Sequence, residues 1–294
     1  MADAYSSQRM YKQARDLFKF NLDRYPHTNK TVWWIRGYVN HSAELGDEVG
    51  VNASIEKLLA EFSSDEYFPT VAYQIGEKLC SKNHPRAAEL LQYVIDKHPD
   101  HEEALNARVR IGHIHIRQGE DGRAESIYND ILSHYAQDLR LPQAIFLMAE
   151  GYWEKAFKEP RQDRQMTEKA KESLQKALAK WEGMIAQFPN APRVAQAHHI
   201  IGDCYYRLGQ YEKAIEYFQK TVDNFPDYEN AWLAQNRIAK VYKFMVRDGI
   251  MPEREAEAAM KAAYQKLIAN YPDCPAAKHA NEWLETYVIS TEGE

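Results

Sequence analysis

The sequence predicts an all-α protein, built as a right-handed α-α superhelix of about 14 antiparallel helices. Turns of similar composition recur along the whole chain, which indicates a repeated structural unit. Between these turns the apolar residues have helical spacing, as in Ala214, Ile215, Phe218 and Val222. No segment shows the alternation of apolar and polar residues that is typical of a strand, so we expect the unit to be a pair of helices.

Each recurring turn is an aromatic residue or His followed by Pro or by a small residue. Because proline cannot continue a helix, these turns mark the ends of the repeated units. The second residues of successive turns lie 37, 36, 37, 53, 37 and 46 positions apart, so two units carry insertions of 16 and 9 residues. The turns are Tyr25-Pro26, Phe62-Ser63, His98-Pro99, Tyr135-Ala136, Phe188-Pro189, Phe225-Pro226 and Tyr271-Pro272.

Three further positions repeat in register with the turns, and their residue types suit a close pair of helices. A small residue on one helix and an alanine on the next let two helices approach, and a large apolar residue fills the space beside them. The small position holds Val39, Gly76, Gly112, Ala149, Gly202, Ala239 and Glu285. The alanine position holds Ala14, Val51, Ala87, Ala124, Ala177, Ala214 and Met260. The large position holds Phe18, Ile55, Leu91, Tyr128, Trp181, Phe218 and Tyr264.

The clearest copy of the pattern lies at residues 198–226, with Ile201-Gly202, Tyr205, Leu208-Gly209, Ala214, Phe218 and Pro226. This copy resembles the tetratricopeptide repeat (TPR), except that His198 stands where the family has Trp. The family period is about 34 residues, whereas the period here is nearer 37. The longer period and the aromatic-Pro turn resemble bacterial cell-envelope TPR proteins of the barrel-assembly lipoprotein and Tol-Pal periplasmic coordinator type.

The repeats predict one domain, a single TPR solenoid over residues 1–294. An opening half-repeat at 5–26 has no partner helix, which would leave Ala14 and Phe18 partly uncovered. A capping helix at 275–289 is expected to close the other end. The complete repeats are expected at 28–63, 66–99, 101–136, 139–189, 191–226 and 228–272.

Both insertions fall between the two helices of a repeat. One includes residues 158–164 and the other residues 247–253, and both are charged and contain proline. We expect them to lengthen the adjoining helices and to project from the same edge of the solenoid. They are either tolerated loop growth or a pair of docking elements.

Composition excludes several classes of protein. Hydrophobic residues make up 45% of the chain and charged residues 27%, which is typical of a folded protein, and no apolar run approaches the about 20 residues of a membrane helix. The net charge of −6 argues against nucleic acid as a partner. Cys80, Cys204 and Cys274 are too few and too far apart for a zinc site or a disulfide framework.

The start of the chain lacks the basic and apolar regions of a secretion signal. We therefore expect a cytoplasmic protein, or a periplasmic or cell-envelope protein if a leader is removed. Nucleophile motifs, phosphate-binding glycine loops and metal-ligand spacings are absent from the sequence, so no catalytic residue, cofactor or metal is expected.

The resemblance implies a scaffold or adaptor that binds a protein or peptide in a groove lined by the first helix of each repeat. Aromatic residues among polar ones suit such recognition, although some of these residues could instead join neighbouring repeats. Helical phase predicts that the groove includes Trp33, Arg36, Asn40, Tyr73, Glu77, Asn106, His113, Arg117, Phe146, Glu150, Trp153, His199, Asp203, Tyr206, Asn236 and Lys240.

Three alternatives stay open. Some TPR proteins bind a C-terminal carboxylate with a basic and amide clamp, and Arg36, Asn40, Gln74 and Arg110 fall at matching positions, but Asn106 replaces a clamp lysine. The chain could also be a structural subunit that forms homo-oligomers through its N-terminal end. A third alternative is a non-catalytic accessory subunit of an enzyme complex.

Overall fold

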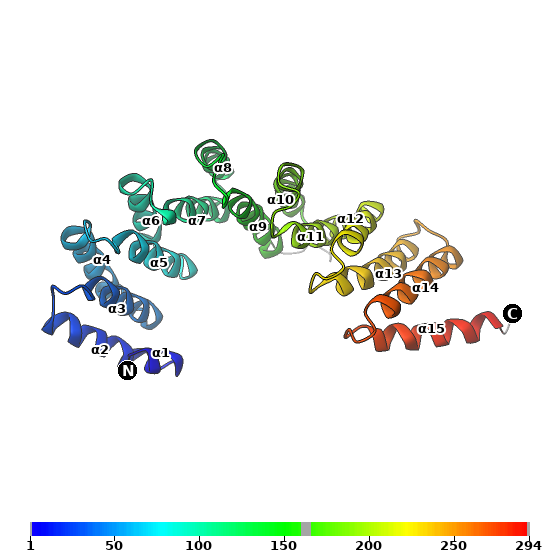
Figure 1. The fold of residues 1–294 in the computed structure, drawn as a ribbon, viewed down its shortest axis with the longest axis horizontal. Coiled ribbons are helices and arrows are strands. Elements are labelled where there is room, and N and C mark those ends of the chain that lie inside the picture. The colour runs from blue at the N-terminus through cyan, green and yellow to red at the C-terminus, as the bar shows by residue number, and fades with distance from the viewer. Residues whose placement is uncertain (1, 160–165, 293–294) are drawn as a thin grey trace. The chain divides into compact units, whose positions relative to one another are not determined.

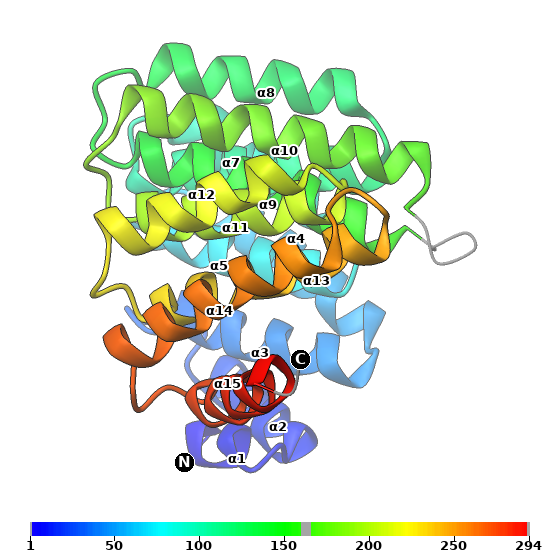
Figure 2. The same ribbon diagram turned by 90° about the vertical axis from the view of Figure 1, so that its right-hand side faces the viewer.

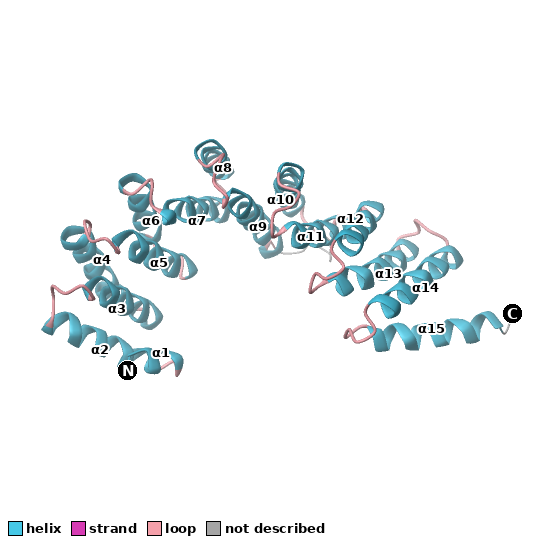
Figure 3. Ribbon diagram, in the orientation of Figure 1, coloured by secondary structure: helices cyan, strands magenta, loops and turns pink. Residues whose placement is uncertain are grey.

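The computed structural model describes residues 2–159 and 166–292, and these residues form helices joined by short loops, with no strand among them (Figures 1 and 3). The all-α architecture predicted from the sequence is therefore confirmed. The helices are α1 Ala2–Ser7, α2 Tyr11–Arg24, α3 Thr31–Leu45, α4 Glu48–Phe62, α5 Phe68–Ser81, α6 Arg86–Lys97, α7 Glu102–Gln118, α8 Asp121–His134, α9 Leu141–Lys158, α10 Glu168–Gln187, α11 Val194–Arg207, α12 Tyr211–Asn224, α13 Ala231–Arg247, α14 Glu253–Asn270 and α15 Ala277–Glu292.

The chain divides into two compact units, unit 1 at residues 1–151 and unit 2 at residues 152–294. Each unit is described by itself, and the single solenoid expected over 1–294 stays a prediction. Within each unit, successive helices pack against one another, as α5 does against α6 and α11 against α12. First helices of neighbouring hairpins also touch, α3 with α5 and α5 with α7 in unit 1, and α11 with α13 in unit 2.

A glycine on the first helix of a hairpin allows the second helix to approach closely. A Cβ added at Gly202 would lie 2.7 Å from the ring of Phe218, and one at Gly76 would lie 2.9 Å from Leu91. Real side chains do not approach this closely, so the ring and the leucine occupy space that only glycine leaves open. The close pairing predicted from the repeated positions is therefore present in both units.

The repeated positions are buried as their register predicts. All seven residues of the alanine position are buried, and so are all residues of the small position except Glu285. In the large position only Phe18 and Tyr128 keep part of their surface exposed. The cysteines Cys80 and Cys204 are buried and Cys274 is partly buried, and all three are free.

The opening half-repeat at 5–26 was expected to be one helix, and this expectation is wrong, because the helix is interrupted between α1 and α2. Arg9 has a positive φ of 57°, and the amides of Arg9 and Met10 donate to the carbonyls of Ser6 and Tyr5 at 3.0 and 2.9 Å. These bonds end α1 in a left-handed cap, which adds a helix to the number expected. The expected exposure of Ala14 is also wrong, since Ala14 is fully buried.

The helices beside the two insertions are long. The second helices α10 and α14 have 20 and 18 residues, whereas α6 and α12 have 12 and 14. The expected lengthening is therefore found. Residues 160–165, which make up most of the first insertion, lie outside the described residues.

The closing helix α15 packs against α14 within unit 2 (Figure 2). The ring of Trp283 lies 5.2 Å from that of Tyr264, so the expected cap contacts the preceding repeat. Helical spacing along the capping helix also predicts Val288 at this contact, but its side chain lies outside the described residues. No helix in the described part of the chain is both long enough and apolar enough to span a bilayer.

We expect Gly202→Ala to lower the free energy of unfolding by about 1–3 kcal/mol, because the new methyl group would overlap the buried Phe218 ring. Gly183→Ala within α10 is the matched control, since no atom lies within 4 Å of its added Cβ. The control should raise stability by about 0.5–1 kcal/mol, because glycine is unfavourable inside a helix. Chemical denaturation of both variants measures the difference, and equal changes in the two would contradict the helix pairing.

Candidate functional site

The structure places most of the predicted groove residues at partly exposed positions, but three of the sixteen are buried. Phe146, His199 and Asn236 are 0%, 7% and 5% exposed, so the expectation that they face a groove is wrong. Arg117 is exposed. The half-buried residues are Trp33, Arg36, Asn40, Tyr73, Glu77, Asn106, His113, Glu150, Trp153, Asp203, Tyr206 and Lys240.

The buried positions have identifiable causes. Helix α9 is apolar around most of its circumference near Phe146, where Ala144, Ile145, Met148 and Ala149 are also buried. The ring of His199 packs against Phe218 at 5.8 Å and against Tyr228 at 6.4 Å. Tyr228 comes from the turn that follows α12. The helical phase of α11 alone therefore does not predict that Tyr228 buries His199.

In unit 1 the predicted residues mostly join neighbouring first helices. Arg36 on α3 donates from Nη1 to Gln74 Oε1 on α5 at 2.6 Å, and its guanidinium lies 4.9 Å from the centre of the Trp33 ring. Trp33 in turn contacts Tyr67 at 5.6 Å. These contacts fasten α3 to α5, which matches the alternative in which such residues hold the repeats together.

The same arrangement continues from α5 to α7. Glu77 forms an ion pair with Arg110, and Tyr73 donates to the same carboxylate at 3.4 Å. Burial, followed by the nearby charge of Glu77, raises the pKa of Tyr73, so its hydroxyl remains a donor. Because Arg36 and Arg110 have partners within the chain, they are not an open clamp for a carboxylate.

Further along unit 1, three other predicted residues also bond to backbone or side chains of the chain itself. Asn106 donates to Glu103 at 2.7 Å, and His113 Nε2 lies 2.6 Å from the carbonyl oxygen of Leu147. Arg117 donates to the carbonyl of Cys80 at 3.3 Å, at the edge of a cavity of about 240 Å³. Most of this face therefore serves packing between hairpins.

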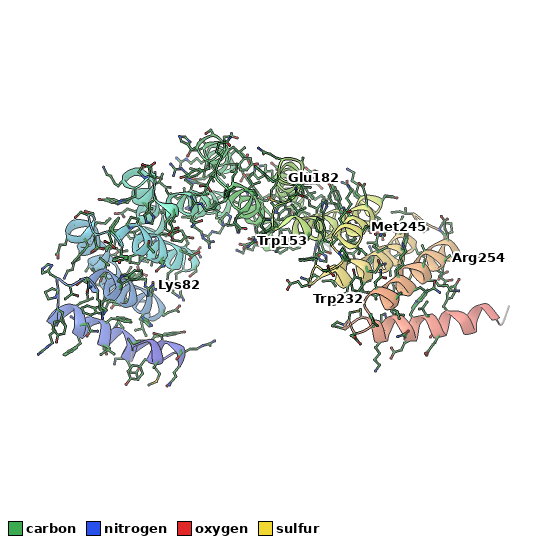
Figure 4. All side chains as sticks on the ribbon, viewed as in Figure 1. Lys82, Trp153, Glu182, Trp232, Met245 and Arg254 are labelled. Carbon is green, nitrogen blue, oxygen red and sulfur yellow. The ribbon has the colours of Figure 1, made fainter. Side chains whose placement is uncertain are left out.

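Unit 2 presents a different surface, in which aromatic rings and guanidinium groups alternate. Trp153, on the last turns of α9 (Figure 4), lies 4.7 Å from Phe157. The guanidinium of Arg207, at the end of α11, lies 4.3 Å from the centre of the Phe157 ring. Arg207 is exposed, and Trp153 and Phe157 are half-buried.

A second group of rings stands at the ends of α11 and α13. Tyr206 meets Phe244 edge to face at 5.2 Å and lies 6.1 Å from Tyr211. The guanidinium of Arg247 lies 4.4 Å from the centre of the Phe244 ring. Contacts of this kind hold a guanidinium over an aromatic face, and Arg247 in addition donates from Nε and Nη2 to Asp248.

This second group of side chains lines a cavity of about 530 Å³ in unit 2, and this volume is within the range of ligand-binding sites. We call it the aromatic–arginine pocket. It is flanked by Met166 and Lys171, which follow the first insertion, and by Arg247 and Asp248, which begin the second. Its principal lining side chains are Tyr206, Arg207, Tyr211, Phe244, Arg247 and Asp248.

The one carboxylate among the pocket's lining residues is already bonded. Arg247 Nε donates to Asp248 at 2.7 Å and the Tyr211 hydroxyl donates to it at 2.5 Å. These two hydrogen bonds, with that of Arg247 the larger, lower the pKa of Asp248. Burial and the bond to Asp248 raise the pKa of Tyr211 to about 12.

Other polar groups of unit 2 lie nearby on the first helices. Asp203 pairs with Arg237 of α13 at 3.2 Å, and His199 Nε2 lies 3.8 Å from Asp203. The pKa of the His199 imidazole is lowered, mainly because the ring is buried. Within the described ranges, no cluster of three or more His, Cys, Asp or Glu side chains is arranged to hold a metal ion.

Sequence reasoning missed most of the pocket. Of the residues that it named, Tyr206 lines the pocket, whereas Trp153 and Lys240 lie one helical turn before the rings of Phe157, which contacts Arg207, and Phe244. A count that continued for one more helical turn would have found both rings, because residues four apart share a helix face. Arg247, at the end of α13, was missed for the same reason. Arg207 is adjacent to Tyr206 and so lies on another face of α11, and Tyr211 begins the second helix α12, so a count along one face of the first helices does not reach them.

Because Phe146 is buried, we expect Phe146→Ala to destabilise unit 1 by about 3–5 kcal/mol. Trp153→Ala should lower the free energy of unfolding much less, because the Trp153 ring is half-buried and packs against Phe157, which is also half-buried. Thermal and chemical denaturation of the two variants test the assignment. A smaller loss for Phe146→Ala than for Trp153→Ala would contradict it.

Comparisons with known proteins agree with the repeat. The family model of the tetratricopeptide repeat matches residues 195–228. No curated protein sequence matches the chain.

Several solved structures are similar at low identity. A tetratricopeptide repeat protein from Parabacteroides merdae has 11% identity over 97% of this chain and 96% of that chain, with a TM-score of 0.46. The C-terminal part of a TPR repeat-containing protein from Cytophaga hutchinsonii has 13% identity, 95% and 97% coverage and a TM-score of 0.45. A human IFIT1 dimer with m7Gppp-AAAA has 15% identity, 96% and 68% coverage and a TM-score of 0.38. The match identifies a tetratricopeptide repeat at residues 195–228, and the helix hairpins with their repeated buried positions show the same repeat architecture in the described parts of both units.

Proposed function

We propose that the chain is a scaffold that holds a protein partner on the first helices of unit 2. The observation that carries this proposal is the partly exposed group of rings formed by Trp153, Phe157, Tyr206 and Phe244. Large rigid rings beside charged side chains are the residue types that dominate binding energy at protein interfaces. The tetratricopeptide fold is in general a fold of protein-interaction scaffolds.

Unit 2 is favoured over unit 1 because of what the side chains already do. In unit 1, Arg36, Glu77 and Arg110 bond across neighbouring helices, so a partner would have to compete with these contacts. In unit 2, Arg207 and Arg247 lie over rings and are exposed. Tyr206 and Phe244 are also partly exposed, and a partner can pack against these rings without displacing an ion pair between hairpins.

The same proposal makes the protein non-catalytic and its partner a protein rather than a nucleic acid. Tetratricopeptide-repeat proteins are generally scaffolds without catalysis. The formal charge of −6 disfavours a phosphate backbone as ligand.

A location in the bacterial cell envelope is also proposed, supported by the repeat period near 37 residues and the aromatic-Pro turns. Cell fractionation with an antibody to the protein tests that location.

Self-assembly is the second candidate function, because helix α2 and its C-cap residue expose two large rings. Phe20 and Tyr25 are 56% and 47% exposed. An interface between copies would bury such rings. Light scattering separates the candidates: a mass that rises with concentration favours self-assembly, and a constant monomer mass favours a scaffold for another protein.

The scaffold proposal is tested by capturing a partner from cell extract with the intact chain and then measuring its affinity. We expect the double variant Trp153→Ala, Tyr206→Ala to bind at least about 30-fold more weakly, which is about 2 kcal/mol. The matched control is Trp33→Ala, Tyr67→Ala, which removes the tilted aromatic pair of unit 1.

The control variant should bind with nearly unchanged affinity if it remains folded by circular dichroism. Loss of binding in the control alone would move the interface to unit 1. Unchanged binding in the Trp153 and Tyr206 variant would contradict the proposal.

A further inference from the structure

Two adjacent histidines, His198 and His199, are buried inside the clearest repeat, near the middle of α11. Each is 7% exposed. The Nδ1 atom of each ring is buried and has no hydrogen-bond partner among the residues that the structure describes. His198 also stands where the tetratricopeptide repeat has Trp, which does not titrate. The repeat therefore holds two titratable rings in positions that suit only a neutral side chain.

The surroundings of His198 oppose a positive charge on its ring. The ring lies 5.7 Å from that of Tyr217 on α12 and 5.9 Å from that of Phe225, which ends α12. The ammonium group of Lys220, also on α12, lies 4.6 Å from the centre of the Tyr217 ring. On α10, the carboxylate of Glu182 already accepts from the Tyr217 hydroxyl at 2.9 Å. Burial first, and the charge of Lys220 second, lower the pKa of His198.

His199 has one carboxylate near it, but that carboxylate already has a partner. The ring of His199 lies edge to face against Phe218 of α12 and Tyr228 of the following turn. Its Nε2 lies 3.8 Å from Asp203 of the same helix, and Asp203 pairs with Arg237 of α13 at 3.2 Å. Burial is the largest effect and lowers the pKa of His199, the charge of Asp203 opposes it, and that of Arg237 adds to it.

Protonation of either ring costs free energy in the folded repeat. A neutral imidazole carries a hydrogen on one nitrogen only, so the buried Nδ1 can remain without one. An imidazolium donates from both nitrogens, and a hydrogen on Nδ1 would be a buried donor without an acceptor on a charged ring. The unfolded chain has no such penalty. Below about pH 6.5, the ordinary pKa of histidine, the unfolded chain therefore binds protons that the folded repeat excludes, and stability falls as the pH decreases.

The two histidines lie in the contact that closes the α11–α12 hairpin, since both rings pack on side chains of α12. The same hairpin carries part of the aromatic–arginine pocket at its other end. Tyr206, near the end of α11, and Tyr211, at the start of α12, both line the pocket, and their rings lie 6.1 Å apart. Separation of α11 from α12 would therefore also separate these two tyrosines.

We propose that His198 and His199 form a pH-sensitive switch, in which protonation in acid opens the α11–α12 hairpin and weakens the binding of the protein partner. Opening of a single hairpin is local unfolding, which needs less free energy than unfolding of the whole chain. Histidine is the side chain whose charge changes between about pH 5 and pH 8. The opening depends on the repeat alone, whereas the weaker binding rests on the proposed scaffold function.

Hydrogen–deuterium exchange of the full chain at about pH 7.5 and about pH 5 tests the switch. The result is expressed as protection factors, which cancel the pH dependence of the exchange chemistry itself. We expect the protection of α11 and α12 to fall at least about tenfold at the lower pH, because two excluded protons each reduce the stability of the hairpin. His98 of unit 1 also has a pKa lowered by burial, so only peptides from α11 and α12 are compared.

The matched variants replace the histidines by phenylalanine, which keeps a ring and removes the titration. In the double variant His198→Phe, His199→Phe, protection of α11 and α12 should fall by less than about twofold between the two pH values. His279→Phe makes the same substitution at an exposed position of α15 and should keep the full fall. Each single variant, His198→Phe or His199→Phe, should lose part of the fall, so the test does not depend on whether the double variant folds.

Affinity for the captured partner gives the second measurement. The wild-type chain should bind at least about tenfold more weakly at about pH 5 than at about pH 7.5, and the double variant should bind nearly equally at both. A wild-type fall in protection of less than about twofold, or an equal fall in the wild type and the variants, would overturn the switch.

The proposed scaffold surface fails separately from the switch. If protection behaves as expected while the variant Trp153→Ala, Tyr206→Ala binds its partner unchanged, the scaffold surface is wrong and the switch in the repeat stands. If protection behaves as expected but affinity for the partner is equal at both pH values, the hairpin opens in acid and the proposed effect on binding is wrong.

Discussion

The close approach of paired helices at a glycine is the constraint on which the rest of this structure depends. Phe218 occupies the space that Gly202 leaves open, and Leu91 does the same at Gly76. Because side-chain period along a helix is constant, fixing one contact of this kind fixes the orientation of both helices of a hairpin. The residues that face the next hairpin, and those that reach solvent, follow from that orientation.

The same orientation has different consequences in the two units because the side chains differ. In unit 1, first-helix positions carry Arg36, Gln74, Glu77 and Arg110, which bond to one another across neighbouring helices. In unit 2 the corresponding region carries rings and exposed guanidinium groups, and the segments next to the insertions add Lys171 and Arg247 to it. Repeats of one architecture can therefore provide a packing face in one unit and a candidate recognition surface in the other.

The repeated pattern was sufficient to predict the helices and their buried positions. Apart from the opening helix, the predicted limits differ from the observed ones by at most three residues, because proline and glycine mark the ends of each unit strongly. Burial that depends on neighbouring helices was not predictable in this way. Phe146 and His199 have the right phase for exposure but are both buried, and His199 packs against Tyr228 from the turn after α12. The break at Arg9 was also missed, since arginine carries no signal for a positive φ.

The central claim is that the first-helix ends of unit 2 form the recognition surface. Hydrogen–deuterium exchange of the full chain, measured with and without the captured partner, tests this claim most directly because it locates protection along the sequence. The account predicts slower exchange on partner binding near residues 153–158, 206–211 and 244–248, with little change in α3, α5 and α7. Protection confined to α3, α5 and α7, or to the second helices α4, α6, α8, α12 and α14, would contradict it.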